Sequence, residues 1–118
     1  MLHGRLARVD TGACIVARLQ RTETPLERMR GLLGRTELAA DAGLLITQCQ
    51  AVHTLGMRYA LDLIYLSRDW QVKKLVRRLA PWRFSVCPGA SMVIELPAGR
   101  LDTLQLSPGL PLRWESLP

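Results

Sequence analysis

Cys49 and His53 are the pair of side chains that could act together as a nucleophile and its base, or as metal ligands. Residues four positions apart in an extended strand are separated by roughly 13 Å, so the two could meet only across a bulge or turn. A tetrahedral metal site needs three or four ligands, and the spacing does not require Cys87 and Asp62 to complete one. We therefore expect buried cysteines and a hydrogen-bonded histidine, with no metal and no cofactor. An enzyme that uses Cys49 or His53, and a disulfide between Cys49 and Cys87, are the alternatives.

Two carboxylates, Asp62 and Glu95, lie within apolar segments that resemble strands. A carboxylate in such a segment is costly unless it is paired. Side chains alternate along a strand, which places Glu95 opposite its two apolar neighbours and predicts that it faces solvent. The carboxylates could instead form internal ion pairs, or line a ligand pocket, with several arginines (Arg35, Arg58 and Arg83).

A mixed polar segment over residues 52–62 lies between two apolar strands, and a second loop is expected over Pro81–Ala90. Binding groups concentrate in loops next to rigid strands. We expect the two segments to meet in a shallow cleft, in which Asp62 orients a cationic partner and His53 responds to pH. The candidate ligand-binding residues are His53, Arg58, Asp62 and Arg83.

Most of the chain's net charge of +6 comes from the stretch between Arg68 and Arg83, which contains six basic residues and a single acidic one, Asp69. Basic residues interleaved with aromatic ones are typical of nucleic-acid binding, because the cations contact phosphates and the rings stack on bases. A solvated hairpin whose arginine stems cover apolar surface is the favoured explanation. In the alternative, a nucleic-acid-binding module, the candidate contacts are Lys73, Lys74, Arg77 and Arg78. We expect nucleic-acid binding to be at most weak and non-specific.

The strongest local signal for regular structure is a helix start at Thr24-Pro25-Leu26-Glu27, a capping box with proline in the first turn. Apolar residues at helical spacing and the stop signal of Gly34 predict a helix over Pro25–Leu33. A short helical turn is expected near Leu101–Leu104.

The remaining segments favour strands, and Asp10-Thr11-Gly12 is typical of the turn of a β-hairpin. The fold class is therefore α+β, a mostly antiparallel β-sheet or small barrel-like domain with one short helix in its first half. The predicted strands cover residues 6–9, 13–19, 44–49, 51–54, 61–66, 72–79, 92–96 and 112–115. Residues 72–79 also fit an amphipathic helix, but their short distance from residues 61–66 favours a hairpin.

Length and composition are those of an ordinary globular protein, with 118 residues, 48% hydrophobic and 22% charged. These values exclude disorder, collagen and coiled coils, and we expect one domain over residues 1–118. There is no uncharged apolar run near 18 residues and no signal-peptide core, so we expect no membrane span and a cytoplasmic protein. Three cysteines, an odd number, argue against a disulfide framework.

Several ordered blocks make the sequence similar to the DUF192 family, a bacterial-type family of unknown function. The resemblance covers about residues 16–112 and implies a compact α+β fold with many antiparallel strands. One departure is Trp70 in a turn where the family commonly has glycine; since glycine supplies a positive φ more easily than tryptophan, we expect a longer turn or one of another type. The blocks are Glu27–Arg35, Gly43–Leu45, Val52–Arg58, Leu61-Asp62 and Glu95–Gly99.

The resemblance implies no settled activity, and there is no glycine-rich phosphate loop and no nucleophile elbow. The favoured interpretation is a non-enzymatic accessory or small-ligand-binding domain, whose partner is an unknown small molecule or protein.

Overall fold

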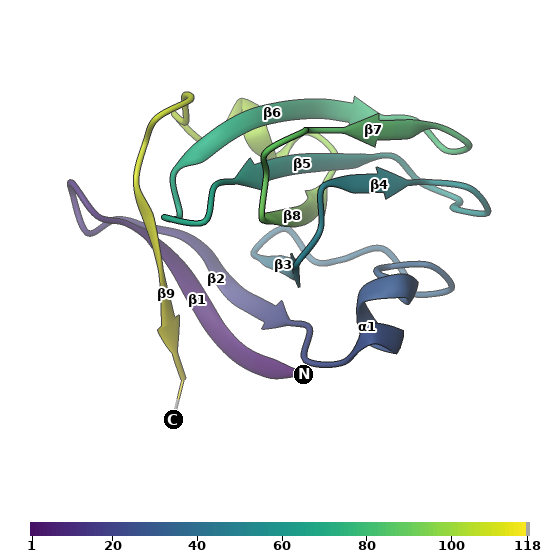
Figure 1. The fold of residues 1–118 in the computed structure, drawn as a ribbon, viewed down its shortest axis with the longest axis horizontal. Coiled ribbons are helices and arrows are strands. Elements are labelled where there is room, and N and C mark those ends of the chain that lie inside the picture. Colours follow the sequence, from purple (N-terminus) through teal and green to yellow (C-terminus); the bar gives the residue numbers. More distant parts are fainter. Residues whose placement is uncertain (118) are drawn as a thin grey trace.

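The computed structural model describes residues 1–117, in which nine strands and two short helical segments make up the regular structure. Seven strands form one sheet in the order β6-β5-β8-β3-β2-β1-β9, and β4 pairs with β7 in a second, two-stranded sheet (Figure 1). The predicted class, a mostly antiparallel β-fold with one short helix, is confirmed. The strands are β1 (Leu2–Arg8), β2 (Cys14–Arg21), β3 (Ala42–Thr47), β4 (Ala51–His53), β5 (Leu61–Leu66), β6 (Val72–Leu79), β7 (Phe84–Val86), β8 (Met92–Pro97) and β9 (Leu112–Ser116).

All eight predicted strands are present, and β5 and β6 have the predicted bounds. The first hairpin is confirmed: β1 and β2 are antiparallel, and Gly12 takes a positive φ of 76° in the turn between them. The expected turn near residues 101–104 is the 3₁₀ helix η1 (Arg100–Asp102).

The prediction of a loop over Pro81–Ala90 is wrong for β7, which pairs with β4 in antiparallel register. Thr54 extends this pairing, since its amide donates to the Arg83 carbonyl at 2.8 Å and its carbonyl accepts from the Trp82 amide at 2.9 Å. The proline and glycine residues in this stretch mark the turns at either end, and a strand of three residues is too short to show alternation.

One pair of neighbouring strands, β2 and β3, is parallel. Parallel strands cannot be joined by a tight turn, so the chain needs a long crossover between them. The crossover contains α1 (Pro25–Arg30) and the segment over residues 31–41, hereafter the crossover segment (Figure 1).

The predicted capping box of α1 is confirmed, because the Thr24 hydroxyl accepts from the Glu27 amide at 3.1 Å and the Glu27 carboxylate accepts from the Thr24 amide at 3.1 Å. The helix ends at Arg30, three residues earlier than predicted. Gly31 takes a φ of 52° and interrupts the helical backbone, and Leu32 then turns inward and is buried.

The centre of the large sheet is buried on both faces. One face carries a core that includes Leu19, Leu45 and Ile94. The opposite face is covered by β4, β7 and Leu32, and there the Tyr65 hydroxyl donates to Ser85 Oγ at 3.0 Å. The two faces together bury every residue of β5 and all of β8 from Met92 to Leu96. Asp62 alternates with Leu61 and Leu63 and so lies on the first face, next to η1.

All three cysteines are free. Cys87 is buried as expected, whereas Cys49 is half-buried and Cys14 is exposed, so the expectation of a buried Cys14 is wrong. Cys14 begins β2 next to the first turn, where the core does not reach it. Within residues 1–117, no helix is long and apolar enough to span a membrane.

Candidate ligand-binding site

The structure brings together the two segments that the sequence analysis placed in one cleft. His53 on β4 is the register partner of Phe84 on β7, and their rings lie 6.4 Å apart between centroids. Arg83 precedes Phe84, and its amide donates to the Thr54 hydroxyl at 2.9 Å. Both His53 and Arg83 are exposed. Their contact with a ligand stays a prediction.

Arg58 lies on a different cavity, of about 590 Å³, between residues 33–37 and residues 56–59. The Tyr59 hydroxyl closes one wall of this cavity by donating to the Arg35 carbonyl at 3.1 Å. Arg58 is exposed, and within residues 1–117 it forms no ion pair. Its predicted role as a ligand contact therefore concerns this cavity and not the strands that carry His53.

Asp62 is completely buried and does not lie at the surface of the expected cleft. One carboxylate oxygen accepts from the Arg78 amide at 2.8 Å, and the other accepts from the Leu101 amide at 2.8 Å. The carboxylate is thus satisfied by backbone amides and not by an arginine side chain, and it connects β5 to β6 and η1.

Glu95 is 3% exposed, so the prediction that it faces solvent is wrong. It does point away from its apolar neighbours, as alternation requires, but β4 and the residues that follow α1 cover that face of the sheet. Burial raises the pKa of Glu95 to about 7, and the Leu32 amide and the Arg35 charge oppose this shift. Oε1 of Glu95 has no hydrogen-bond partner within the described residues.

Cys49 and His53 both line a small cavity of about 60 Å³ next to Glu95. The Cys49 thiol donates to the Ala51 carbonyl at 3.0 Å. Burial raises the pKa of the Cys49 thiol, and the nearby Glu95 charge adds to this effect. A raised pKa keeps the thiol protonated, which is the opposite of what an activated nucleophile needs.

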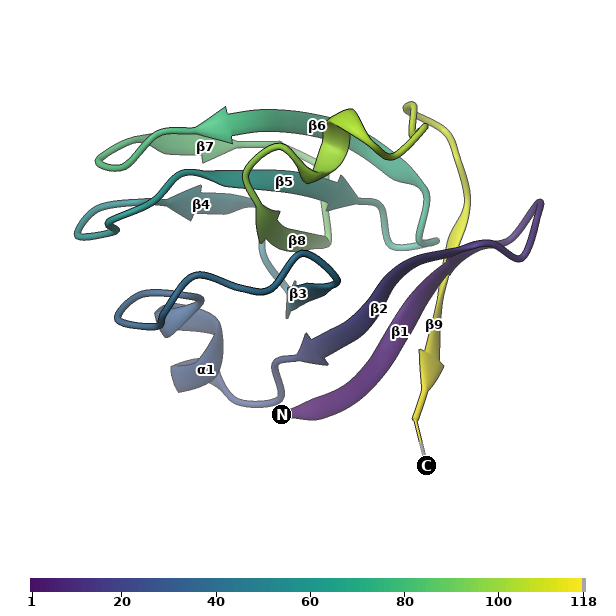
Figure 2. The same cartoon turned by 180° about the vertical axis from the view of Figure 1, so that it is seen from behind.

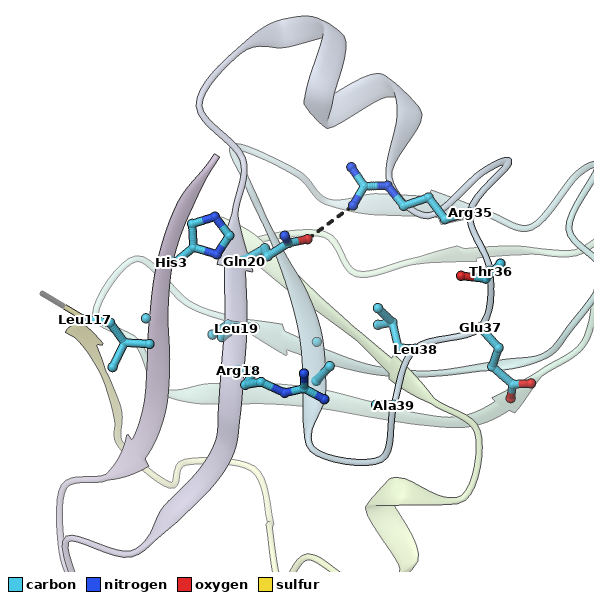
Figure 3. Close-up of a pocket in the computed structure, with 13 residues that line it drawn as sticks. His3, Arg18, Leu19, Gln20, Arg35, Thr36, Glu37, Leu38, Ala39 and Leu117 are labelled. Atoms are coloured by element: carbon cyan, nitrogen blue, oxygen red, sulfur yellow. Dashed lines mark hydrogen bonds between the residues drawn. The ribbon is translucent and has the colours of Figure 1, made fainter.

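A larger cavity of about 720 Å³ lies between β2 and the crossover segment, where the sequence analysis placed no site. Figure 3 shows His3 and Gln20 side by side on β1 and β2, with Arg35 reaching toward them from the crossover segment. Arg35 Nη1 donates to Gln20 Oε1 at 3.2 Å. The lining residues are His3, Gly4, Arg18, Leu19, Gln20, Arg35, Thr36, Glu37, Leu38, Ala39, Ala42, Gly43 and Leu117.

The charges in this cavity differ in how far they are neutralised. Arg18 forms a bidentate ion pair with Asp41, in which Nε donates to Oδ2 at 3.0 Å and Nη2 donates to Oδ1 at 2.6 Å. Arg35 forms no ion pair within residues 1–117, and its side-chain hydrogen bond goes to a neutral amide. The Glu37 carboxylate points away from Arg35 in Figure 3. Arg35 is therefore the cation of this cavity that an anion could pair with.

The four basic residues of the nucleic-acid alternative all lie on β6, an edge strand of the large sheet. Arg77 and Arg78 both pair with Asp102, at 3.6 Å and 2.5 Å. Lys74 Nζ donates to the Val86 carbonyl at 2.9 Å. Much of the positive charge in this stretch of the sequence is therefore engaged in ion pairs and hydrogen bonds with other parts of the protein.

Within residues 1–117, no group of three or more His, Cys, Asp or Glu side chains is arranged to hold a metal ion.

Two curated relatives, both UPF0127 proteins, are similar to part of the chain. The protein of Thermococcus sibiricus is 36% identical over 66 residues, which are 55% of this chain and 42% of that protein. The protein of Pyrococcus furiosus is 37% identical over 68 residues, which are 57% of this chain and 58% of that protein. The match therefore spans about half the length of these relatives.

Two solved structures have a similar fold. One, from Sinorhizobium meliloti and described as a "putative transcription regulator", has a TM-score of 0.80 at 22% identity and covers 96% of this chain and 92% of its own. The other, a protein of unknown function from Novosphingobium aromaticivorans, has a TM-score of 0.76 at 21% identity and covers 95% and 84%. At these identities the likeness shows the fold alone.

The family model DUF192, described as "Uncharacterized ACR", matches residues 7–114, almost the whole chain. The blocks that carried the resemblance in the sequence lie within this range. The chain belongs to the DUF192 family.

Proposed function

We propose that this protein is a small-ligand-binding domain whose ligand is an organic anion, a carboxylate or a phosphate ester, held in the 720 Å³ cavity. The observation that carries the proposal is Arg35, whose guanidinium reaches into this cavity and bonds only to the neutral Gln20 amide. A planar guanidinium binds carboxylate and phosphate groups in a bidentate geometry, so Arg35 suits a ligand that carries one of these groups.

The size and the lining of the cavity support a ligand larger than an inorganic ion. Binding sites for small molecules commonly measure about 300–1,000 Å³ and combine apolar walls with a few polar groups. Leu19, Leu38 and Leu117 supply apolar surface, and His3 and Gln20 supply further polar groups beside Arg35. A ligand with an apolar body and one anionic end fits this lining.

Arg58 belongs to the proposal as a second contact. The 590 Å³ cavity that it lines shares Arg35, Thr36 and Glu37 with the first cavity, so the crossover segment forms a wall of both. A longer ligand could extend from one to the other. His53 and Arg83 lie on the β4–β7 sheet, and their predicted role as ligand contacts is kept as a separate hypothesis.

An accessory role without catalysis is part of the same proposal. The alternative of an enzyme that uses Cys49 gains no support from a thiol whose pKa is raised. We also keep the expectations of a cytoplasmic protein and of nucleic-acid binding that is at most weak and non-specific.

The test is a thermal-shift screen of the whole chain against inorganic phosphate, phenyl phosphate, hexanoate and the neutral isostere hexanamide. A ligand that prefers the folded state raises the melting temperature in proportion to ln(1 + [L]/Kd). We expect phenyl phosphate or hexanoate to raise it and hexanamide not to. Equal shifts with hexanoate and hexanamide, or no shift with either organic anion, would overturn the proposal.

A further inference from the structure

A smaller cavity, separate from the 720 Å³ cavity of the proposed anion site, lies at Glu95. Its volume is about 60 Å³, and none of its lining residues belongs to the 720 Å³ cavity. A water molecule takes up about 30 Å³ of liquid, so the cavity holds roughly two or three non-hydrogen atoms. Met29 and His53 line it and are exposed, which places its mouth at the surface between α1 and β4.

One oxygen of the Glu95 carboxyl group lacks a partner in this cavity. This oxygen, Oε1, is buried and receives no hydrogen bond within residues 1–117. The backbone leaves room around this atom: a Cβ at Gly31 would lie 2.9 Å from Oε1, closer than side chains tolerate. A buried acceptor without a donor is costly, so a donor that enters from outside is stabilised here.

The cation whose charge acts on Glu95 does not fill this need. Arg35 is close enough to favour the ionised form of Glu95, but its guanidinium donates to Gln20 in the other cavity. The remaining polar and charged groups around the cavity are Arg28 and Arg30 on α1, Cys49, and His53 on β4. Arg30 is held at the rim, where its Nε donates to the Leu33 carbonyl at 3.1 Å.

The other walls are apolar and come from three elements: Ile46 on β3, Val52 on β4 and Met57 in the loop that follows. A ligand that enters must therefore present hydrocarbon to these side chains and a strong donor to the carboxyl group. An alkylammonium group does both, because its nitrogen carries three donors and a positive charge and its stem is aliphatic.

We propose that the Glu95 cavity binds a primary alkylammonium group, with the ammonium at the Glu95 carboxylate and its first methylene groups between Ile46, Val52 and Met57. The free protein holds a proton on part of its Glu95 population near neutral pH, since burial raises the pKa of Glu95 to about 7. Binding of the ammonium keeps the carboxylate ionised and releases that proton to solvent. The positive charges of Arg28 and Arg30 repel a cation that approaches the cavity. Salt screens this long-range repulsion more than it screens the buried contact between the ammonium and Glu95.

The experiment follows the Glu95 side-chain carbonyl carbon by NMR as a function of pH, with and without n-propylammonium, in about 0.15 M salt. An opposite charge at contact distance lowers the pKa of a carboxyl group by about 1–3 units. We expect a saturable decrease of this size in the pKa of Glu95 with n-propylammonium and none with n-propanol. An unchanged pKa, or the same change with both compounds, would overturn the proposal.

Two variants complete the test. Glu95→Gln keeps the shape of the protonated side chain but cannot ionise, and we expect it to lose saturable binding of n-propylammonium. Glu37→Gln is the matched control, because Glu37 is exposed and lies outside this cavity. Unchanged binding in Glu95→Gln, or equal loss in both variants, contradicts the proposal. The measurement on the unchanged chain stands even if Glu95→Gln fails to fold.

An alkylammonium group has two sources, a free amine and the lysine side chain of a polypeptide. Titration with Nα-acetyl-lysine-N-methylamide separates them. Binding at least tenfold tighter than that of n-propylammonium assigns the site to a lysine of a partner, and binding of equal strength assigns it to a free amine. Failure of both compounds overturns the alkylammonium proposal and leaves the anion proposal standing, because the Glu95 cavity shares no residue with the 720 Å³ cavity that holds Arg35.

Discussion

Asp62 and Leu101, 39 positions apart in the chain, are joined by a 2.8 Å hydrogen bond from the Leu101 amide to the Asp62 carboxylate. The second carboxylate oxygen accepts from the Arg78 amide at 2.8 Å. Figure 2 shows η1, which contains Leu101, beside the sheet strands β5 and β6. One buried side chain therefore connects three elements and supports the C-terminal part of the fold.

Removal of this side chain is expected to destabilise the protein strongly. Asp62→Ala leaves the buried Leu101 amide and the part-buried Arg78 amide without an acceptor. A buried amide without an acceptor costs about 1–3 kcal/mol and a partly solvated one costs less, so we expect a loss of about 2–4 kcal/mol. Asp62→Asn keeps one acceptor and should lose less. Urea unfolding of the three proteins measures the difference. A stability of Asp62→Ala within about 0.5 kcal/mol of the original would contradict this role.

Thr24→Ala removes one half of the capping box of α1 and is expected to cost about 1 kcal/mol of stability. The Thr24 hydroxyl accepts from the Glu27 amide in the structure, and alanine offers no such acceptor. Thr24→Ser, which keeps a hydroxyl, is the control and should stay within a few tenths of a kcal/mol of the original. Equal stability of the alanine and serine variants would show that the cap contributes nothing.

The stability of the protein should depend on the ionisation of Glu95. A glutamate in the unfolded chain titrates near 4.5, whereas burial raises the pKa of Glu95 in the folded protein to about 7. Between these values the unfolded chain gives up its proton first, so the free energy of unfolding decreases as pH rises from about 4.5 to 7. The decrease levels off above pH 7 and amounts to about 3 kcal/mol.

The difference between the original protein and Glu95→Gln isolates this effect, because the other carboxylates titrate equally in both. Chemical unfolding at several pH values should show Glu95→Gln gaining relative stability from pH 4.5 to 7. A pH-independent difference would mean that Glu95 is ionised in the folded protein throughout this range.

Nucleic-acid binding is expected to be weak, with a Kd of about 10⁻⁴–10⁻⁶ M at physiological salt and no sequence preference. The structure favours this outcome because Arg77 and Arg78 share Asp102 and Lys74 bonds to the Val86 carbonyl. Fluorescence anisotropy with labelled DNA and RNA over a salt series checks it. Submicromolar affinity for one sequence, lost in an Arg77→Ala, Arg78→Ala double variant, would instead support the nucleic-acid alternative.

Signals confined to a few neighbouring residues predicted the local structure well. The capping box at Thr24 and the Asp10-Thr11-Gly12 turn each depend on contacts within about five residues, and both are present. The helical spacing of Leu26 and Met29 located α1 but not its packing, since these side chains are 75% and 77% exposed. Leu32, just past the helix end, is the side chain that reaches the core.

Trp70 shows how packing can overrule a backbone preference. The turn has three residues between Ser67 and Gln71, longer than the shortest hairpin turns, as expected. Trp70 nevertheless takes a φ of 63°, which glycine would adopt more easily. Its ring packs partly against the core, and the Arg21 guanidinium lies 5.5 Å from the ring centroid. These contacts stabilise a conformation that the sequence did not favour.

The candidate site was the least predictable part, for a topological reason. Strands that are adjacent in the sequence were expected to pair antiparallel. Antiparallel neighbours can be joined by short turns, so the sequence analysis predicted no long crossover. Parallel pairing of β2 and β3 places the crossover segment beside β2, which brings Arg35 to Gln20 from 15 positions away. Glu95 was misplaced for a related reason, because β4 and β7 add a layer over a sheet face that alternation alone assigns to solvent.

The most direct test of the proposed function maps the binding of phenyl phosphate on the backbone amides by NMR, in the original protein and in Arg35→Gln and Arg58→Gln. We predict saturable shifts at His3, Gln20 and Arg35, at least tenfold weaker binding in Arg35→Gln, and a smaller loss in Arg58→Gln. Arg35→Gln also removes a cation without emptying the cavity, so a loss of affinity reports on charge and not on shape. Unchanged affinity in Arg35→Gln, or shifts confined to residues outside both cavities, would contradict the assignment of the anion site.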